Sequence, residues 1–285
     1  MHSSPCIHAI FLPTKTMPPA KGTNAYLIGT KDLILVDPGD PNPESIEKIL
    51  NEMKALGGER ITDVIITHAH PDHYEGADSI FERTGARFMA HELTAQKISG
   101  QCKKAKIDLF LRDNQNLNLN GLKATVIHSP GHSPESICLY LEDQKALISG
   151  DTIVGFGTVV ISPPDGDMSQ YLNSLRRLLN YHIERIYPGH GPIVEEGKAK
   201  IEEYIQHRLL REYQILKELQ SGTKSVKDLV KVIYQELDIM VHGADLHERA
   251  ERSVLAHLIK LETENKVIKK GQEKDETVYA LQDRA

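Results

Sequence analysis

One stretch, residues 64–76, constrains this chain more than any other, because an apolar β-branched run is followed within six positions by His68, His70, Asp72 and His73. A short apolar run that ends in a polar cluster predicts a buried strand that opens into a functional loop. Successive side chains of an extended backbone alternate, so the first two histidines leave on the same face. Pro71 then interrupts the strand and turns the chain. Two imidazoles should therefore converge on one point, and a carboxylate with a third imidazole on a neighbouring one.

The donor types in this stretch point to a metal site. Neutral imidazole and carboxylate are ligands that zinc, iron and manganese accept. A mixture of nitrogen and oxygen donors without a thiolate is typical of a catalytic site rather than a closed structural one. The alternative is a loop of four solvated polar side chains. A single His-x-His pair would leave that alternative open, but His-x-His-x-Asp-His directly after a strand favours metal binding.

Length and composition set the outer limits. A chain of 285 residues holds one large domain, or one domain with a small appendix. The content of 40% hydrophobic and 26% charged residues is ordinary for a soluble globular protein. No apolar run approaches the ~20 residues that span a bilayer. Neither a secretory signal nor an amphipathic transit peptide is evident at the start. We therefore expect an intracellular protein, cytoplasmic or in the mitochondrial matrix, without a membrane partner.

Cysteine usage and charge exclude further classes. The three cysteines, Cys6, Cys102 and Cys138, lack CxxC spacing, which suits a reducing compartment and argues against a disulfide framework or a cysteine-based zinc site. The net charge of -6 lies before Lys198, because the chain from there onward is neutral. Bulk charge therefore gives no signature of a high-affinity nucleic-acid binder.

Strands and helices are interspersed along the first two thirds of the chain. The predicted strands are 24–29, 33–37, the run before His68, 85–90, 122–128, 136–141, 145–149 and 185–187. The predicted helices are 43–56, 92–98 and 168–179. Residues 101–120 give no clear prediction, and 155–167 is expected to be a loop beside the site. Each polar cluster falls just after a strand, which predicts an α/β sandwich whose loops meet along one edge.

Three later residues repeat the theme of the opening stretch. His132, Asp151 and His190 each stand beside glycine at a strand end, where glycine lets the backbone pass close to an ion. Singly, each could be a turn residue. Added to residues 68–73 they make five histidines and two aspartates, enough for two metal ions and a water. Asp37, at the end of a buried strand, either caps a turn or orients a metal-bound histidine.

Together these residues resemble the five motifs of the metallo-β-lactamase superfamily over about residues 20–195. The resemblance implies an αββα sandwich and two divalent metal ions, with Zn²⁺ expected first and manganese or iron also compatible. It implies that one ion is held by His68, His70 and His132. It implies that the second ion is held by Asp72, His73 and His190. Asp151 would bridge the two ions, and Asp37 would orient a ligand from outside.

Flanking motifs narrow the resemblance to the lactamase-β-like protein 2 group. The similar segments are 22–27, 155–158, 171–175, 187–192 and His207-Arg208-x-x-Arg211-Glu212. Members of that group include a single-strand-preferring endoribonuclease and carry a small C-terminal winged-helix domain. This chain departs from the pattern at Ala69, Pro71 and Tyr74. Those positions face substrate or loop rather than metal, so the departures concern substrate choice.

The tail predicts a second domain. A long helix over 195–219 is followed by helices over 223–233 and 246–261, and then by a hairpin of 267–268 and 277–281 with a polar turn around Gly271. Helix, helix and hairpin indicate a winged helix, although a packing or dimerisation appendix stays open. We therefore predict a catalytic domain over 1–195, and a helical linker with a winged-helix-like domain over 196–285.

Two cations that share a water lower its pKa and hold a hydroxide for in-line attack, with Asp72 and Asp151 as the catalytic residues that anchor and orient it. His128 either assists substrate oxygens from the second shell or is bonded locally. The first hypothesis is a metal-dependent endoribonuclease acting on single-stranded RNA. The alternative is a thioesterase or other small-ester hydrolase, and a homodimer is left open.

Three other functions are disfavoured. A β-lactamase would need an export signal, which is not visible. A redox di-iron protein would carry a carboxylate where His70 stands. A metal-stabilised binding module without turnover would be expected to have lost a ligand, and none is lost.

Overall fold

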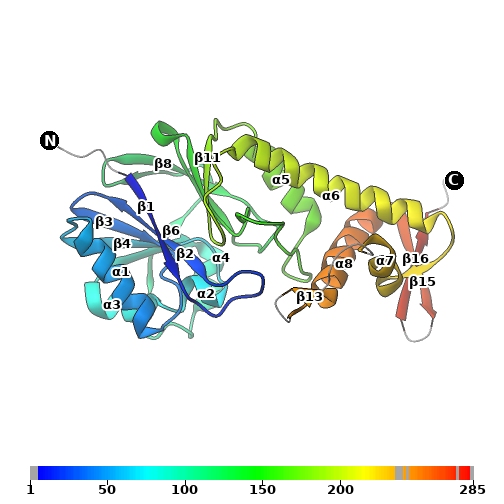
Figure 1. The fold of residues 1–285 in the computed structure, drawn as a ribbon, viewed down its shortest axis with the longest axis horizontal. Coiled ribbons are helices and arrows are strands. Elements are labelled where there is room, and N and C mark those ends of the chain that lie inside the picture. Colours follow the sequence, from blue (N-terminus) through cyan, green and yellow to red (C-terminus); the bar gives the residue numbers. More distant parts are fainter. Residues whose placement is uncertain (1–5, 235–239, 242–243, 274–275, 283–285) are drawn as a thin grey trace.

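The structure is a computed structural model that describes residues 6–234, 240–241, 244–273 and 276–282. Figure 1 shows a larger lobe built on two sheets and a smaller helical lobe, joined by the long helix α6 (Gly197–Leu219). Among the described helices, none combines the length and the apolar character that a membrane crossing requires.

Two sheets form the larger lobe. The first has the order β1-β2-β3-β4-β5-β6, with β1 (Cys6–Leu12), β2 (Thr23–Gly29), β3 (Asp32–Val36), β4 (Arg60–Ile66), β5 (Arg87–His91) and β6 (Ile107–Leu111). The second has the order β11-β10-β9-β8-β7, with β7 (Asn116–Leu119), β8 (Leu122–His128), β9 (Ile137–Leu141), β10 (Ala146–Gly150) and β11 (Arg185–Pro188). The pairs β3/β4 and β10/β11 are parallel, so each sheet brings neighbouring carboxyl ends to the same edge.

Helices cover both sheets. They are α1 (Pro43–Ala55), α2 (Pro71–Tyr74), α3 (Ala77–Thr84), α4 (Glu92–Ile98) and α5 (Met168–Leu178), with the short 3₁₀ helix η1 (Glu142–Gln144). Alternation along β3 shows the layering: Leu33 and Leu35 pack toward α1, whereas Ile34 and Val36 pack between the two sheets. A third core lies between the second sheet and α5 with α6. These three apolar layers make the predicted αββα sandwich.

Elements with a strong local pattern were predicted well. The ranges 92–98 and 122–128 match α4 and β8 residue for residue. The loop over 155–167 is confirmed, because no helix or strand falls within it. The strands β1, β6 and β7 and the helices α2 and α3 were not predicted. The first three are edge strands or lie in the Lys- and Asn-rich stretch, where pairing with distant residues rather than local pattern decides the structure.

The smaller lobe contains α7 (Val226–Ile233), α8 (His247–Thr263) and a sheet of order β12-β16-β15, with β12 (Lys224–Ser225), β15 (Val267–Glu273) and β16 (Glu276–Leu281). The short strands β13 (Met240–Val241) and β14 (Ala244–Asp245) pair before α8. Ser225 and Asp228 form a reciprocal capping box that starts α7. The turn predicted around Gly271 is wrong, because β15 continues through an irregularity there to Glu273.

Helix α6 belongs to both lobes. Its first half places Ile201, Tyr204 and Ile205 in the core against the second sheet. Its second half places Ile215 and Leu219 in the core of the smaller lobe. The two lobes therefore share one continuous helix, and the division predicted between residues 195 and 196 stays a prediction.

Candidate metal centre

The strand ends bring all seven predicted ligands to one place. His68 and His70 follow β4, and Pro71 then starts α2, which carries the next two ligands. The other three follow strands of the second sheet. The side chains fall into two groups whose donor atoms lie within 4.8 Å of one another: His68, His70, His132 and Asp151, and Asp72, His73 and His190.

Short distances join the first group. His70 Nδ1 lies 2.9 Å from His68 Nε2 and 3.0 Å from His132 Nε2. Asp151 Oδ2 lies 3.7 Å from the same His132 nitrogen. The four donor atoms thus surround a point that a single cation can occupy.

The second group lies directly beside the first. His190 Nε2 is 3.4 Å from both Asp72 Oδ2 and His73 Nε2. Asp151 Oδ1 is 3.5 Å from His73 Nε2, and Asp151 Oδ2 is 3.2 Å from His190 Nε2. Asp151 therefore stands between the two groups, in the position that a bridging carboxylate requires.

Acceptors on the outer side of the imidazoles fix where their protons lie. His73 Nδ1 donates to Asp37 Oδ2 at 2.8 Å, and His190 Nδ1 donates to the Gly22 carbonyl at 2.8 Å. His132 Nδ1 donates to the carbonyl of Val160 at 3.1 Å. Each of these rings therefore keeps a proton on Nδ1 and turns Nε2 toward the centre, as metal-bound histidines do.

Thr67 extends this arrangement to His68. Its hydroxyl donates to Asp37 Oδ2 at 2.7 Å and accepts from His68 Nδ1 at 3.0 Å. Its backbone N–H donates to Asp37 Oδ1 at 2.8 Å. Asp37, which is 2% exposed, thereby contacts His73 directly and His68 through Thr67. No role was predicted for Thr67, although its place between the strand and His68 was a usable signal.

These residues fit a divalent cation. Asp151 Oδ1 is buried without a hydrogen-bond partner and lies 3.5 Å from His73 Nε2, so this carboxylate oxygen is left for a cation to satisfy. Burial lowers the pKa of His73, but the carboxylates of Asp151 and Asp37 outweigh burial and raise it to about 10. The carboxylates therefore draw positive charge to this point, which is what a metal ion provides.

The other pKa shifts agree with that charge pattern. Burial raises the pKa of Asp151, but the nearby His190 and His73 outweigh burial and hold it well below its ordinary value. Burial and the neighbouring His132 lower the pKa of His70 to about 4. The centre therefore holds an ionised carboxylate beside a neutral imidazole, and both are in the state in which such groups bind metal.

Glycine is required at position 189, directly before His190. A Cβ atom there would lie 2.4 Å from Asp151 Oδ1 and 2.7 Å from His73 Cε1, which no side chain tolerates. The Asn24 amide holds the same loop, because it donates to the carbonyls of Pro188 at 3.0 Å and Gly191 at 2.8 Å. Asn24 belongs to one of the flanking motifs, 22–27, but its role could not be read from sequence.

His128 lies apart from the seven ligands. Its Nε2 atom donates to the Pro134 carbonyl at 2.8 Å, and its ring stacks on His91 with centroids 4.5 Å apart. Within the described chain, His128 is in neither of the two groups of candidate ligands. The structure shows the local bonding considered for His128, and its assistance to substrate oxygens stays a prediction.

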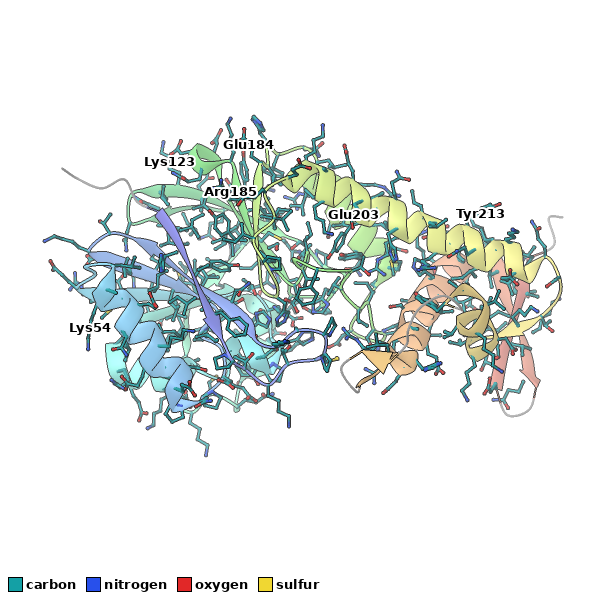
Figure 2. All side chains as sticks on the ribbon, in the orientation of Figure 1. Lys54, Lys123, Glu184, Arg185, Glu203 and Tyr213 are labelled. Carbon is teal, nitrogen blue, oxygen red and sulfur yellow. The ribbon has the colours of Figure 1, made fainter. Side chains whose placement is uncertain are left out.

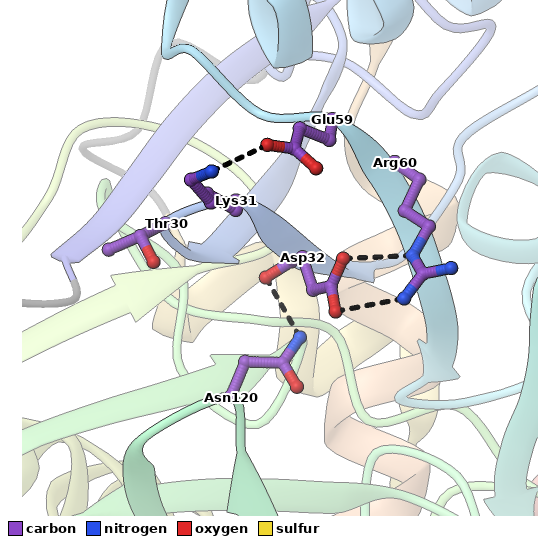
Figure 3. Close-up of a pocket in the computed structure, with 6 residues that line it drawn as sticks. All are labelled: Thr30, Lys31, Asp32, Glu59, Arg60 and Asn120. Atoms are coloured by element: carbon purple, nitrogen blue, oxygen red, sulfur yellow. Dashed lines mark hydrogen bonds and ion pairs between the residues drawn. The ribbon is translucent and has the colours of Figure 1, made fainter.

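The hollow in Figure 3 is a different feature. It is lined by Thr30, Lys31, Asp32, Glu59, Arg60 and Asn120. Asp32 and Arg60 are the first residues of β3 and β4, so the hollow lies at the opposite end of the strands from the ligands. Its charges already pair with one another, with Arg60 Nε 2.8 Å from Asp32 Oδ1 and Lys31 Nζ 2.8 Å from Glu59 Oε1. It is not the candidate centre.

Comparisons with known proteins identify both parts of the chain. The family described as "Metallo-beta-lactamase superfamily" matches residues 18–190, and "Beta-lactamase associated winged helix domain" matches residues 225–275. The "Beta-lactamase-like protein 2 homolog" of Drosophila melanogaster is 32% identical over 274 residues, covering 92% of this chain and 89% of the relative. The protein of the same name from Caenorhabditis elegans is 34% identical over 231 residues, covering 80% of this chain and 76% of the relative.

Solved structures agree on the fold. A beta-lactamase domain protein from Burkholderia ambifaria superposes with a TM-score of 0.82 at 19% identity, covering 96% of this chain and 91% of that one. A metallo-beta-lactamase family protein from Thermus thermophilus superposes with a TM-score of 0.76 at 22% identity, covering 96% and 98%. At these identities the likeness concerns the fold alone.

Proposed function

The chain belongs to the metallo-β-lactamase superfamily, and from this premise we propose that it is a metal-dependent endoribonuclease that cleaves single-stranded RNA. Its fold is that of a superfamily hydrolase, and its histidines and aspartates form a cluster suited to divalent metal ions. The nuclease activity, the preference for single strands and the choice of Zn²⁺ are the proposal.

The observation that carries the proposal is the pair of adjacent ligand groups with Asp151 between them. Two divalent cations, when bound there, supply a water of lowered pKa and positive charge opposite the substrate oxygens. Asp151 and Asp72 then orient the attacking water, and Thr23 holds Asp72 through a hydrogen bond of 3.1 Å to its Oδ2 atom. Asp37 keeps His73 and His68 aimed inward.

The second lobe favours a polymeric substrate. It carries a winged-helix domain, a type of module that binds nucleic acids in many proteins. Arg252 of α8 reaches the loop over 155–167, with its Nη1 atom 3.4 Å from Ser162 Oγ. The same loop accepts the hydrogen bond from His132. The smaller lobe thus contacts the same loop that bonds to His132.

A thioester or other small ester is the second candidate substrate. The observation that favours it is charge: the chain is -6 overall, which gives a polyanion no general attraction. A two-metal centre can also act on a planar carbonyl, because the same water and the same charge neutralisation serve both reactions.

The deciding experiment offers both substrates to the zinc-loaded protein. We expect cleavage of a labelled single-stranded RNA, slower cleavage of the duplex of the same sequence, and no turnover of an acyl thioester. His190→Ala should abolish the activity, whereas His182→Ala, at an exposed histidine paired with Glu184, should retain it. Hydrolysis of the thioester alone would replace the nuclease assignment by the ester hydrolase.

A further inference from the structure

Arg208 is a buried arginine without a carboxylate partner. It lies on α6 and is 2% exposed, whereas Figure 2 shows Glu203 and Tyr213 on the outer side of the same helix. Within the residues that the structure describes, no Asp or Glu forms an ion pair with it. Its Nε atom is buried without a hydrogen-bond partner. Such a charge is costly to bury, so its retention calls for a reason other than stability.

One contact of Arg208 is with the loop over 155–167, which accepts a hydrogen bond from His132. Its Nη2 atom donates a short hydrogen bond to the carbonyl of Val159. The next carbonyl along the chain, that of Val160, accepts from His132 Nδ1 at 3.1 Å. The segment has no helix or strand of its own to keep it in place. The guanidinium therefore fixes the backbone one residue from the atom that orients a predicted ligand.

A second contact of Arg208 is with Tyr171, which packs on the residue that precedes His132. The guanidinium carbon of Arg208 lies 5.5 Å from the centroid of the Tyr171 ring. The backbone of Tyr171 packs so closely on Gly131 that a Cβ atom there would lie 2.3 Å from Tyr171 Cα. Gly131 directly precedes His132. The arginine thus supports both flanks of this histidine.

Tyr171 also reaches the bridging carboxylate. Its hydroxyl donates to the Thr152 carbonyl at 2.8 Å, next to Asp151 in the chain. Burial raises the pKa of this hydroxyl well above its ordinary value, so it stays a donor. Arg208, through Tyr171, therefore acts on two of the four donors of the first group.

We propose that Arg208 is a positioning residue that sets His132 and Asp151 for the first metal ion, from the helix that the two lobes share. The inference rests on the proposed metal centre and adds a residue that lies outside it. A planar guanidinium suits the task, because it donates along one edge and packs its face on an aromatic ring, whereas a lysine offers only a point charge.

The variants to compare are Arg208→Met, Arg208→Lys and Lys260→Met. The last is the matched control, because Lys260 is a buried cation of the same inter-lobe region but bonds to Glu212 and Glu264. If Arg208 had a purely structural role, Arg208→Met and Lys260→Met should have the same effect on the loop and on zinc affinity. If Arg208 is a positioning residue, only Arg208→Met should change them.

The first readout needs no metal. Hydrogen exchange of the metal-free protein should be faster in Arg208→Met than in the wild type at residues 159–161, and unchanged there in Lys260→Met. Equal exchange at these residues in wild type and Arg208→Met would overturn the proposed contact. This result is independent of whether the centre binds metal.

The second readout is metal binding. The wild type should bind two zinc ions. Arg208→Met should lower the zinc affinity of the group His68, His70 and His132 by roughly 10- to 100-fold, the usual effect of losing a residue that supports a metal ligand from outside. The other ion should be unaffected, Arg208→Lys should fall between, and Lys260→Met should match the wild type.

The proposal would be overturned if Arg208→Met bound both zinc ions with the affinity of the wild type. It would also be overturned if Lys260→Met lost as much zinc affinity as Arg208→Met. If Arg208→Met does not fold, wild-type affinity in Arg208→Lys overturns it instead. A wild-type protein that binds no zinc would refute the proposed function, an outcome distinct from all of these.

Discussion

Two of the regions that bury charged side chains in this molecule satisfy them in opposite ways. In the metal centre Nδ1 of His73 and Nδ1 of His190 have acceptors within the chain, while their Nε2 atoms lie beside other candidate ligands. Where α8 packs against α6, a contact called the seam here, the buried Lys260 Nζ lies 2.8 Å from Glu212 Oε1 and 2.7 Å from Glu264 Oε1. The centre is therefore suited to an added cation, whereas the seam pairs its own charges.

This difference separates function from architecture. A buried ion pair that is complete in itself is weak evidence for stability, but removing one partner leaves an uncompensated charge. A converging set of lone pairs and carboxylates instead gains its stability when a ligand binds. Changes in the centre should therefore appear as lost activity and lost metal response, and changes in the seam as lost stability.

The largest expected effect comes from Asp151→Asn. The substitution keeps the shape of the side chain but removes the charge that stands between the two ligand groups. Hydrolysis should fall below detection, and metal analysis should find fewer than two ions per chain. Asp165→Asn, in the exposed part of the neighbouring loop, serves as the control and should leave both unchanged. Two bound ions and full activity in Asp151→Asn would remove the bridging role.

Removal of metal should have the next largest effect. A ligand that binds only the folded state stabilises it by about 4 kcal/mol when its free concentration is 1,000-fold above Kd. Thermal unfolding with and without a chelator should therefore show a large metal-dependent rise in Tm. Glu212→Gln should begin from a lower Tm but show the same rise. An unchanged wild-type Tm after chelation would contradict the prediction that the centre gains stability from bound metal.

Breaking the ion pairs of the seam should lower the free energy of unfolding by somewhat less than metal removal does. Glu212→Gln leaves Lys260 with only Glu264, and we expect a loss of about 3 kcal/mol in the free energy of unfolding, near the low end for a broken buried ion pair. Denaturant unfolding measures it, and zinc affinity should stay at the wild-type value. The double variant Glu212→Met with Lys260→Met should recover most of the loss. An unchanged unfolding free energy in the single variant would show that the pair contributes nothing.

The two regions also differ in how far sequence predicts them. His68, His70, His132, Asp151 and His190 could be recognised because each is a ligand-type residue just after a strand, and strand ends of a sandwich meet. Nothing local connects Arg208 to Val159, which lies 49 residues away along the chain. That contact depends on how α6 packs across the second sheet, which no periodicity specifies.

A weaker signal for the seam was nevertheless present. Ile201, Tyr204, Ile205 and Ile215 occupy one stripe of α6, and the charged Arg208 and Glu212 fall on that same stripe. Charged residues at core positions of a long helix indicate either a buried pair or a functional contact. The edge strands β6 and β7 had no comparable signal, because partners distant in sequence define them.

The smallest expected effect is the pH dependence of the seam. Burial raises the pKa of Glu212, but His257 and Lys260 outweigh burial and hold it below its ordinary value. A carboxyl whose folded pKa is depressed contributes stability that is present above the unfolded pKa and is lost as pH falls through the folded pKa. Acidification below the ordinary glutamate pKa of about 4.3 should therefore destabilise the wild type more steeply than Glu212→Gln.

Denaturant unfolding of the metal-free proteins at a series of acidic pH values measures how steeply each unfolding free energy falls with pH. Equal slopes in the two proteins would show that Glu212 is not the group that titrates. Because the chelated centre is the same in both proteins, its own histidines and aspartates titrate equally and cancel in the difference, so the remaining slope belongs to the seam.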